Sequence, residues 1–325
     1  MTHGSIIGYD INAKMCQISY YNEKTQEPET VDTGIEKENN QIPLVMNYYK
    51  ETWTYGRQAR RMSTVRDSIC VEGIWECALG NRKIEVDGQE YEGVQLLADF
   101  VKYTLNGFEE IESITFTVPE KNEDIRVLLK GIGQKLGVAK ENIYVQDYKE
   151  SFCHYMFNQP KELWQYEAAL FYCDEDVIRA YMLRELKNSS QKSRESFVTV
   201  DKVADARMEE LEAVYPVLHV EKAKAADEHF KRFIQSVFNK KMISSVFLTG
   251  DGFENNWYPN SLKVLCNGRR AFLGNNLYSK GACYSSMRYA DPYDDGPIYL
   301  DGTKMTEQIC LRMRIAGQEG WYPIV

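Results

Sequence analysis

Cysteine and histidine are the residue types of this chain that most directly suggest metal binding or nucleophilic catalysis. The 325 residues include eight cysteines and four histidines, but no two cysteines form a Cys-x-x-Cys pair. A structural zinc site takes four such ligands at short spacings, so this pattern argues against one. Cys153 and His154 are adjacent, yet neighbours on a helix point in different directions, which argues against a Cys–His nucleophile. We therefore expect buried, reduced thiols that act as small apolar residues in a reducing compartment.

The net charge argues against nucleic acid as a partner. Lys and Arg total 39 and Asp and Glu total 48, which gives −9 at pH 7. Affinity for nucleic acid comes mainly from neutralising phosphates with basic side chains. The basic clusters at Arg57, Arg60 and Arg61 and at Lys240 and Lys241 are therefore interpreted as solvated faces.

The composition predicts a folded, cytoplasmic chain with no membrane contact. Hydrophobic residues make up 43% and charged residues 27%, which is typical of globular proteins. No apolar run approaches the roughly 20 residues that span a bilayer. Residues 1–8 are too short for a secretory signal and lack its basic flank. The length corresponds to about two domains.

The first half of the chain alternates between predicted strands and helices. Apolar runs at 6–10 and 17–21 flank a short connection, which predicts a β-hairpin. Asp87 and Gly88 form a strong turn signal inside a later hairpin. The other predicted elements are strands at 41–49, 51–55, 113–118 and 142–145, and helices from 93 to 105, at 123–136 and at 149–158.

The second half repeats this alternation. Apolar runs at 168–172 and 177–183 are joined by Asp174-Glu175-Asp176, and the polar segment 187–195 is typical of a loop. Two successive strand–helix halves indicate an α/β protein with two lobes. The remaining predicted elements are helices at 203–211, 227–239, 260–266 and 278–287 and strands at 245–248, 298–300 and 308–315.

Taken in order, short segments resemble the nucleotide-binding domain shared by DnaK-type chaperones, actin and sugar kinases. The resemblance covers roughly residues 6–287 and is closest to the chaperone branch. No single match is specific, but their order and spacing together are informative; another two-lobed α/β protein is the alternative. The matching segments are Ile7-Gly8-Tyr9-Asp10 (first phosphate loop), Ile42-Pro43 with Tyr55–Ala59, Val86–Tyr91 (a hairpin before a helix), Ile114–Pro119 (a strand ending Val-Pro), Asp147 to Tyr155 (first interlobe connection), Phe247–Gly252 (adenosine loop) and Gly281-Ala282 (second connection).

The resemblance implies a two-lobed, ribonuclease-H-like α/β fold with a cleft between the lobes. Lobe I would span residues 1–165, with a small inserted subdomain at about 20–92. Lobe II would span 166–295, with a shortened insert at about 201–226. Residues 296–325 would form a C-terminal β extension that either packs on lobe II or marks the chain as a shortened version of a longer protein.

The resemblance also implies roles for individual residues. Asp10 and Asp147 are the candidate catalytic acids, and Asp10, Asp147 and Asp174 could hold Mg²⁺. Three other roles stay open: Asp10 as a strand-end turn former, Asp147 as a helix N-cap, and Lys14 as a solvent-facing residue instead of a cation for phosphate. The candidate contacts to ATP or ADP are Asn12, Ala13, Lys14, Gly250, Asp251 and Gly252.

The second phosphate loop departs most from the family pattern. The family has Asp-Leu-Gly-Gly-Gly-Thr between two strands, whereas this chain has Cys173-Asp174-Glu175-Asp176. Glycines matter there because a side chain would collide with the phosphates. Two unit charges ~6 Å apart repel by roughly 3 kcal/mol at an effective dielectric of 20. Several such terms would outweigh the ~8 kcal/mol of a micromolar affinity. The water-aligning lysine, expected near Gly73, is also missing.

These features predict a degenerate family member that has kept the fold and lost ATP hydrolysis. Such a chain would be a binding or regulatory scaffold, with another protein as its partner; the number of aromatic residues, 22 Tyr, 13 Phe and 5 Trp, is compatible with a partner surface. The first alternative is an active, Mg²⁺-dependent chaperone-like or actin-like ATPase. The second is a small-molecule kinase with Asp147 as its catalytic acid. Neither the identity of the partner nor the oligomeric state follows from the sequence.

Overall fold

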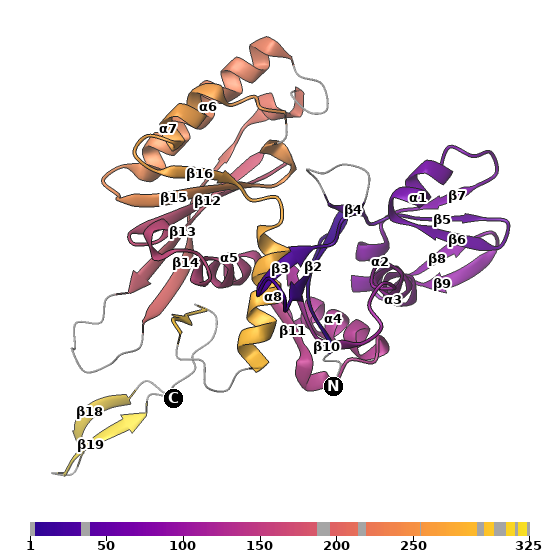
Figure 1. Cartoon of the computed structure of the whole chain (residues 1–325), viewed down its shortest axis with the longest axis horizontal. Coiled ribbons are helices and arrows are strands. Elements are labelled where there is room, and N and C mark those ends of the chain that lie inside the picture. The colour runs from indigo at the N-terminus through magenta and orange to yellow at the C-terminus, as the bar shows by residue number, and fades with distance from the viewer. Residues whose placement is uncertain are drawn as a thin grey trace.

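The computed structural model describes residues 4–33, 40–186, 196–213, 219–253, 255–290, 296–301, 310–315 and 318–323. The chain is mixed α/β, which confirms the predicted class. Two large sheets lie next to each other with helices between them, and a smaller group of strands and helices extends from the first sheet (Figure 1).

The first sheet joins an antiparallel hairpin to two parallel strands. Its strands are β1 (Ser5–Ile11), β2 (Met15–Asn22), β3 (Glu27–Thr30), β10 (Ile111–Val118) and β11 (Ile143–Asp147), in the spatial order β11-β10-β1-β2-β3, with the short β4 (Ile42–Pro43) also paired to β2. β1 is antiparallel to β2 and parallel to β10, which is parallel to β11. Six consecutive residues of β10 are buried, as expected for a central strand covered on both faces.

The second sheet repeats this arrangement. Its strands are β12 (Glu167–Asp174), β13 (Val177–Leu186), β14 (Phe197–Arg207), β15 (Ile243–Thr249), β16 (Arg270–Leu273) and β17 (Ile298–Tyr299), in the order β16-β15-β12-β13-β14-β17. Again one strand, β12, is antiparallel to the next strand and parallel to a later one. The carboxyl ends of parallel strands meet at the same edge of a sheet. The carboxyl ends of β1, β10 and β11 therefore share one edge of the first sheet, and those of β12, β15 and β16 share one edge of the second.

The small inserted group builds on the first sheet. It contains β5 (Met46–Tyr49), β6 (Thr52–Tyr55), α1 (Gly56–Met62), β7 (Ile69–Val71), α2 (Ile74–Leu79), β8 (Lys83–Val86), β9 (Gln89–Glu92) and α3 (Gly93–Thr104). Its apolar side chains join the core cluster of the first sheet. The first part of the predicted insert, about 20–43, contributes β3 and β4 to the first sheet, where both pair with β2.

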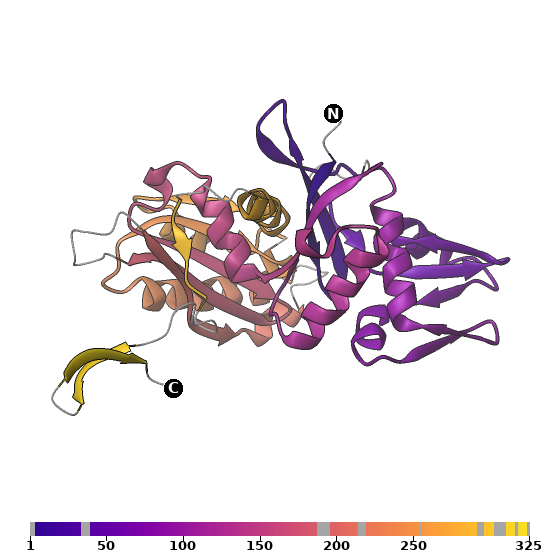
Figure 2. The ribbon, with the colours of Figure 1, turned by 90° about the horizontal axis from the view of Figure 1, so that it is seen from below.

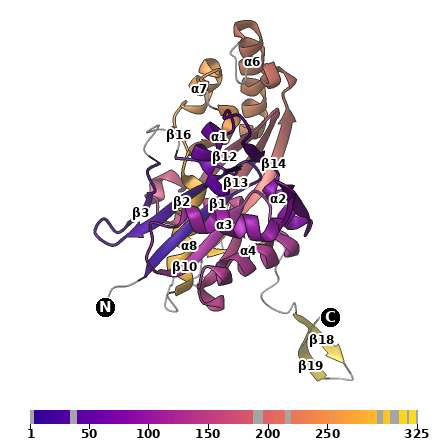
Figure 3. The same cartoon turned by 90° about the vertical axis from the view of Figure 1, so that its right-hand side faces the viewer.

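The helices cover the sheets (Figures 2 and 3). α4 (Glu123–Lys135) is N-capped by Asn122, whose side chain accepts a hydrogen bond from the Ile125 backbone N–H. The other helices are α5 (Tyr148–Phe157), α6 (Val220–Phe238), α7 (Pro259–Leu265) and α8 (Leu277–Ala290). No helix in the described ranges has both the length and the apolarity needed to cross a membrane.

Two predictions about the end of the second half need revision. The helix predicted at 203–211 is wrong, because β14 continues to Arg207 and pairs along β13 as far as Val177. The shortened insert at 201–226 therefore begins as strand, continues as a 3-10 turn (Glu209–Ala213) and enters α6. The predicted loop at 187–195 lies outside the described residues.

The C-terminal extension divides into two parts. β17 adds to the second sheet beside β14, so this part of the extension packs on the second half of the chain. The strands β18 (Cys310–Ile315) and β19 (Gln318–Pro323) form a separate two-stranded sheet, which lies away from both main sheets in all three views (Figures 1, 2 and 3).

Helix α8 links the two halves of the molecule. It follows the second sheet in sequence but packs on β1, β2 and β10 of the first sheet and on α5. A Cβ at Gly281 would lie 2.0 Å from the Ser151 carbonyl oxygen, so only glycine permits this approach of α8 to α5. Buried hydroxyl pairs, Ser19 with Ser279 at 2.8 Å and Thr115 with Ser286 at 2.6 Å, complete the contact with the first sheet.

We expect Gly281→Ala to destabilise the protein by about 1–3 kcal/mol, because the added methyl group forces α5 and α8 apart. Gly131→Ala is the matched control, since a Cβ at Gly131 in α4 meets nothing within 4 Å. Replacing that helical glycine should be neutral or stabilise by about 0.5–1 kcal/mol. Chemical unfolding of both variants checks this. Equal stabilities of the two variants would contradict it.

Candidate functional site

A cavity of about 770 Å³ opens between the carboxyl-end edges of the two sheets. Its walls come from the β1–β2 turn, the end of β10, the start of α5, the β12–β13 hairpin, the segment after β15 and the start of α8. Both repeated sheets thus contribute equivalent hairpins to one cleft. A volume of this size is within the range of small-molecule sites.

The two hairpins that face each other across this cleft are joined by ion pairs. Lys14 Nζ lies 3.1 Å from Asp174 Oδ1 and 2.9 Å from Glu175 Oε1. Partial burial acts to lower the pKa of Lys14, but the two carboxylates outweigh it and raise that pKa. The expectation that Lys14 faces solvent or a phosphate is thus replaced by a third arrangement, a contact with the acidic turn.

Backbone geometry fixes both hairpins in this position. Asn12 Oδ1 accepts hydrogen bonds from the backbone N–H groups of Lys14 (2.8 Å) and Met15 (3.0 Å), which holds the first turn closed. In the second turn Glu175 has φ of 55°, a left-handed conformation that glycine usually occupies. A carboxylate-bearing residue is therefore held in a backbone conformation that glycine usually adopts.

Asp10 is buried at the deep end of the cleft with 2% of its surface exposed. Its Oδ1 accepts a hydrogen bond of 2.8 Å from the Tyr148 hydroxyl. Burial raises the pKa of Asp10 to about 7; the Tyr148 hydrogen bond acts to lower it, and the charge of Asp251 raises it further. Asp10 thus lies in the cleft as predicted, as a carboxyl group that titrates near neutral pH.

Three tyrosines, which the sequence reasoning missed, surround Asp10. The rings of Tyr148 and Tyr278 stack with centroids 3.7 Å apart and planes 6° apart. The Tyr172 ring meets the Tyr148 ring edge-on at 5.6 Å. The Tyr278 hydroxyl is 2.7 Å from Thr249 Oγ1. Each tyrosine stands at a strand end or a helix start, but three residues this far apart in sequence give no local signal that they meet.

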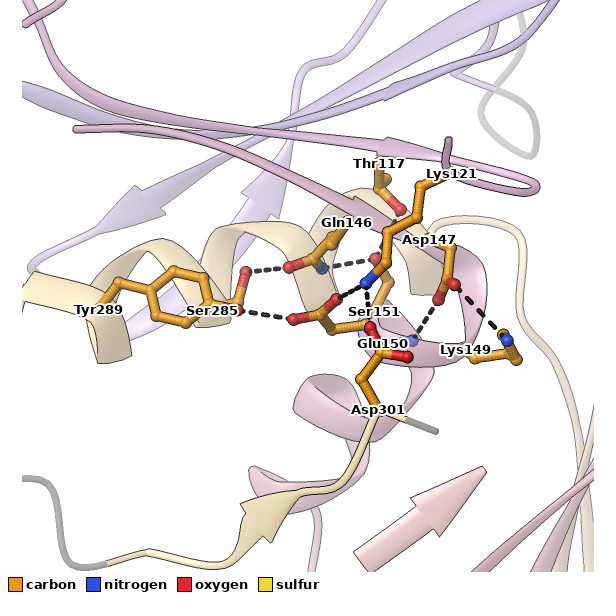
Figure 4. Close-up of polar contacts among 10 residues, drawn as sticks. All are labelled: Thr117, Lys121, Gln146, Asp147, Lys149, Glu150, Ser151, Ser285, Tyr289 and Asp301. Carbon is orange, nitrogen blue, oxygen red and sulfur yellow. Dashed lines mark hydrogen bonds and ion pairs between the residues drawn. The ribbon is translucent and has the colours of Figure 1, made fainter. Parts of the chain in front are cut away.

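Asp147 has a structural role in the first turn of α5. Its Oδ1 accepts a hydrogen bond of 3.0 Å from the Glu150 backbone N–H, and its Oδ2 lies 3.6 Å from Lys149 Nζ (Figure 4). It is not among the residues that line the cavity. The helix N-cap alternative is therefore confirmed.

The structure does not gather Asp10, Asp147 and Asp174 into one set of metal ligands. Asp10 bonds Tyr148, Asp147 caps α5, and Asp174 pairs with Lys14. Within the ranges that the structure describes, no group of three His, Cys, Asp or Glu side chains is arranged to hold a metal ion.

The segment after β15 packs tightly against the second hairpin. Gly250 has φ of 93°, and a Cβ there would lie 2.1 Å from the Cys173 carbonyl oxygen. A Cβ at Gly252 would lie 2.1 Å from Cys173 Sγ. Of the predicted cleft residues in this segment, Gly250 and Asp251 line the cavity, and Gly252 instead packs on β12. Asn12, Ala13 and Lys14 line it as predicted.

Comparison with known proteins gives one family match. The model described as "Family of unknown function (DUF5716) C-terminal" matches residues 27–302, which include both main sheets except β1 and β2. The chain belongs to the DUF5716 family. No curated protein matches it. The match leaves the first hairpin, with Asp10 and Lys14, outside its range.

The DUF5716 chain also has a partly buried charge cluster next to the cleft (Figure 4). Lys121 Nζ lies 2.6 Å from Glu150 Oε2 and 2.8 Å from Asp301 Oδ2, and Tyr289 donates a 2.7 Å hydrogen bond to Glu150. Burial acts to lower the pKa of Lys121, but the neighbouring carboxylates outweigh burial and raise that pKa. The cluster ties segment 296–301 to α5 and to the loop after β10.

The raised pKa of Asp10 can be tested through the pH dependence of stability. The folded pKa of about 7 lies above the ordinary value of 3.8, so the folded state keeps a proton that the unfolded state has lost. Stability therefore falls as pH rises from about 4 to about 7. Asp10→Asn carries no charge and retains an acceptor for Tyr148. The free energy of unfolding of the variant, measured relative to that of wild type, should therefore be about 2–3 kcal/mol higher at pH 8 than at pH 5.

Chemical unfolding at both pH values measures this gain. Asp67→Asn is the control, because the Asp67 side chain is 84% exposed and should give the same difference from wild type at either pH. If the Asp10→Asn difference is also independent of pH, Asp10 does not titrate near 7 in the folded protein.

Proposed function

We propose that this DUF5716 chain is a DnaK/actin-like protein that does not hydrolyse ATP and serves as a binding or regulatory scaffold for another protein in the cytoplasm. The repeated strand order supports a two-lobed, ribonuclease-H-like fold: a hairpin followed by two parallel strands occurs in both sheets. The cavity between the equivalent edges supports a shared cleft. The seven cysteines whose side chains the structure describes, all but Cys310, are free thiols, which agrees with a reducing compartment.

The observation that carries the proposal is the Lys14 bridge to Asp174 and Glu175. A polyphosphate between the two hairpins would have to displace Lys14 and then lie beside two carboxylates. Each carboxylate ~6 Å from a phosphate charge costs roughly 3 kcal/mol at an effective dielectric of 20. Lys14, the cation that could offset this repulsion, already forms ion pairs with the two carboxylates of the turn.

The first alternative remains an active, Mg²⁺-dependent ATPase. The cavity volume of about 770 Å³ and the position of Asp10 in the cleft favour it. The kinase alternative has less support, because its candidate acid, Asp147, caps α5 and does not line the cavity.

Titration calorimetry with ATP and with ADP, each with Mg²⁺, tests the proposal. We expect no heat of binding at ligand concentrations up to about 1 mM and no phosphate release. Micromolar affinity together with turnover would replace the scaffold by the ATPase alternative.

A charge-only double variant tests the reason for the loss. Asp174→Asn with Glu175→Gln keeps the shape of the turn, removes two repulsive charges and frees Lys14, so we expect ATP affinity to rise at least about tenfold over wild type. Glu90→Gln is the control, since it breaks a comparable exposed ion pair of 2.9 Å with Lys83, outside the cavity lining. An unchanged affinity in the double variant would show that the acidic turn is not what excludes nucleotide.

A further inference from the structure

The deep end of the cleft holds two carboxylates whose charge is not neutralised by ion pairs. Asp10 Oδ1 bonds Tyr148, whereas Oδ2 has no hydrogen-bond donor among the residues described. Asp251, which lies in the 3-10 turn after β15 (Asp251–Phe253), is half-buried and makes no hydrogen bond or ion pair within the same part of the chain. Both line the cavity, and they are close enough for the charge of Asp251 to raise the pKa of Asp10.

The basic side chains that line the cavity contact groups other than Asp10 and Asp251, although one of them, Arg179, lies beside Tyr172 in the same cavity. Lys14 pairs with Asp174 and Glu175. Lys149 lies 3.6 Å from Asp147 Oδ2. Arg179 lies 6.0 Å from the centre of the Tyr172 ring. Of the lining cations, none pairs with Asp10 or Asp251 in the described structure.

Aromatic rings stand next to these carboxylates. Tyr172 is half-buried and lines the cavity, and burial together with the charges of Asp174, Asp10 and Asp251 raises the pKa of its hydroxyl. Three carboxylates therefore act on one tyrosine. Carboxylates beside aromatic rings are the surroundings that organic ammonium groups prefer, since the ring face and the carboxylate both attract the cation.

We propose that this cavity binds a small organic cation, an aliphatic amine, with its ammonium group at Asp10 and Asp251 and its carbon chain against the tyrosine rings. The inference rests on the proposed function, because a cavity lined by Asp10, Asp174 and Asp251 would repel a polyphosphate and attract an amine. Asp10 is a buried residue that lines the cavity, and its Oδ2 accepts no hydrogen bond within the described residues, so an ammonium group in the cavity would find an acceptor there.

The probe is 1,4-diaminobutane, which carries two ammonium groups on a flexible four-carbon chain. The matched neutral compound is 1,4-butanediol, which has the same chain length and no charge. We expect calorimetry to show saturable binding of the diamine and none of the diol. Asp10→Asn and Asp251→Asn should each weaken diamine binding roughly ten- to a hundredfold, the loss expected for one charge-assisted hydrogen bond. The exposed Asp67→Asn should leave it unchanged.

Proton release gives a second readout specific to Asp10. At pH 6 the Asp10 carboxyl, with a pKa of about 7, is mostly protonated, so a bound ammonium group should expel a proton. The groups that face it are Tyr148, Tyr172, Tyr278 and Cys16, whose raised pKa values keep them neutral from pH 5 to pH 8, together with Asp251. Calorimetry at pH 6 in two buffers of different ionisation enthalpy should report the release, and Asp10→Asn should abolish it.

The outcomes separate this inference from the proposed function. If neither the diamine nor ATP binds at about 1 mM, the cation site is wrong and the scaffold proposal stands. Diamine binding that survives in both Asp10→Asn and Asp251→Asn also overturns the site. If ATP binds at micromolar concentration and displaces the diamine, the proposed function fails while the cavity remains a ligand site.

Discussion

One contact across the cleft, between Lys14 and the turn that contains Asp174 and Glu175, determines how the two halves of this protein present their hairpins. In each half a hairpin delivers its turn to the sheet edge, and in the space between them a basic side chain meets two acidic ones. The ion pairs are half exposed, so their contribution to stability is small, about 0–1 kcal/mol for such pairs. Their importance is positional, since they bring a basic and two acidic side chains together at the cleft between the two hairpins.

At the deep end of the cleft, behind this contact, a buried carboxyl group is surrounded by tyrosine side chains. Asp10, Tyr148, Tyr172 and Tyr278 converge from β1, α5, β12 and α8, so four elements from both halves meet at one point. A carboxyl group held there has an elevated pKa because water is excluded and few donors replace it.

The link between the halves combines an apolar core with polar contacts. Phe152 of α5 packs edge-on against Phe247 of β15, within a core cluster that joins α5 to the second sheet. Gly281 allows α8 to approach α5, and hydroxyl pairs such as Thr115 with Ser286 connect α8 to the first sheet. The partly buried Lys121 cluster joins segment 296–301 to α5.

Local patterns in the sequence determined the α/β class, the hairpin whose first strand carries Asp10, most helices and the acidic turn at 174–176, because periodicity, caps and turn residues act over a few neighbours. Through a resemblance they also singled out Asn12, Ala13 and Lys14, which line the cavity. Only the tertiary structure decided that β14 extends to Arg207, that Asp147 caps a helix and that Lys14 crosses to the second hairpin. The Asp147 cap is local, but the sequence left it as one of two roles. The Lys14 contact joins residues 160 positions apart, so no short window of sequence contains both partners.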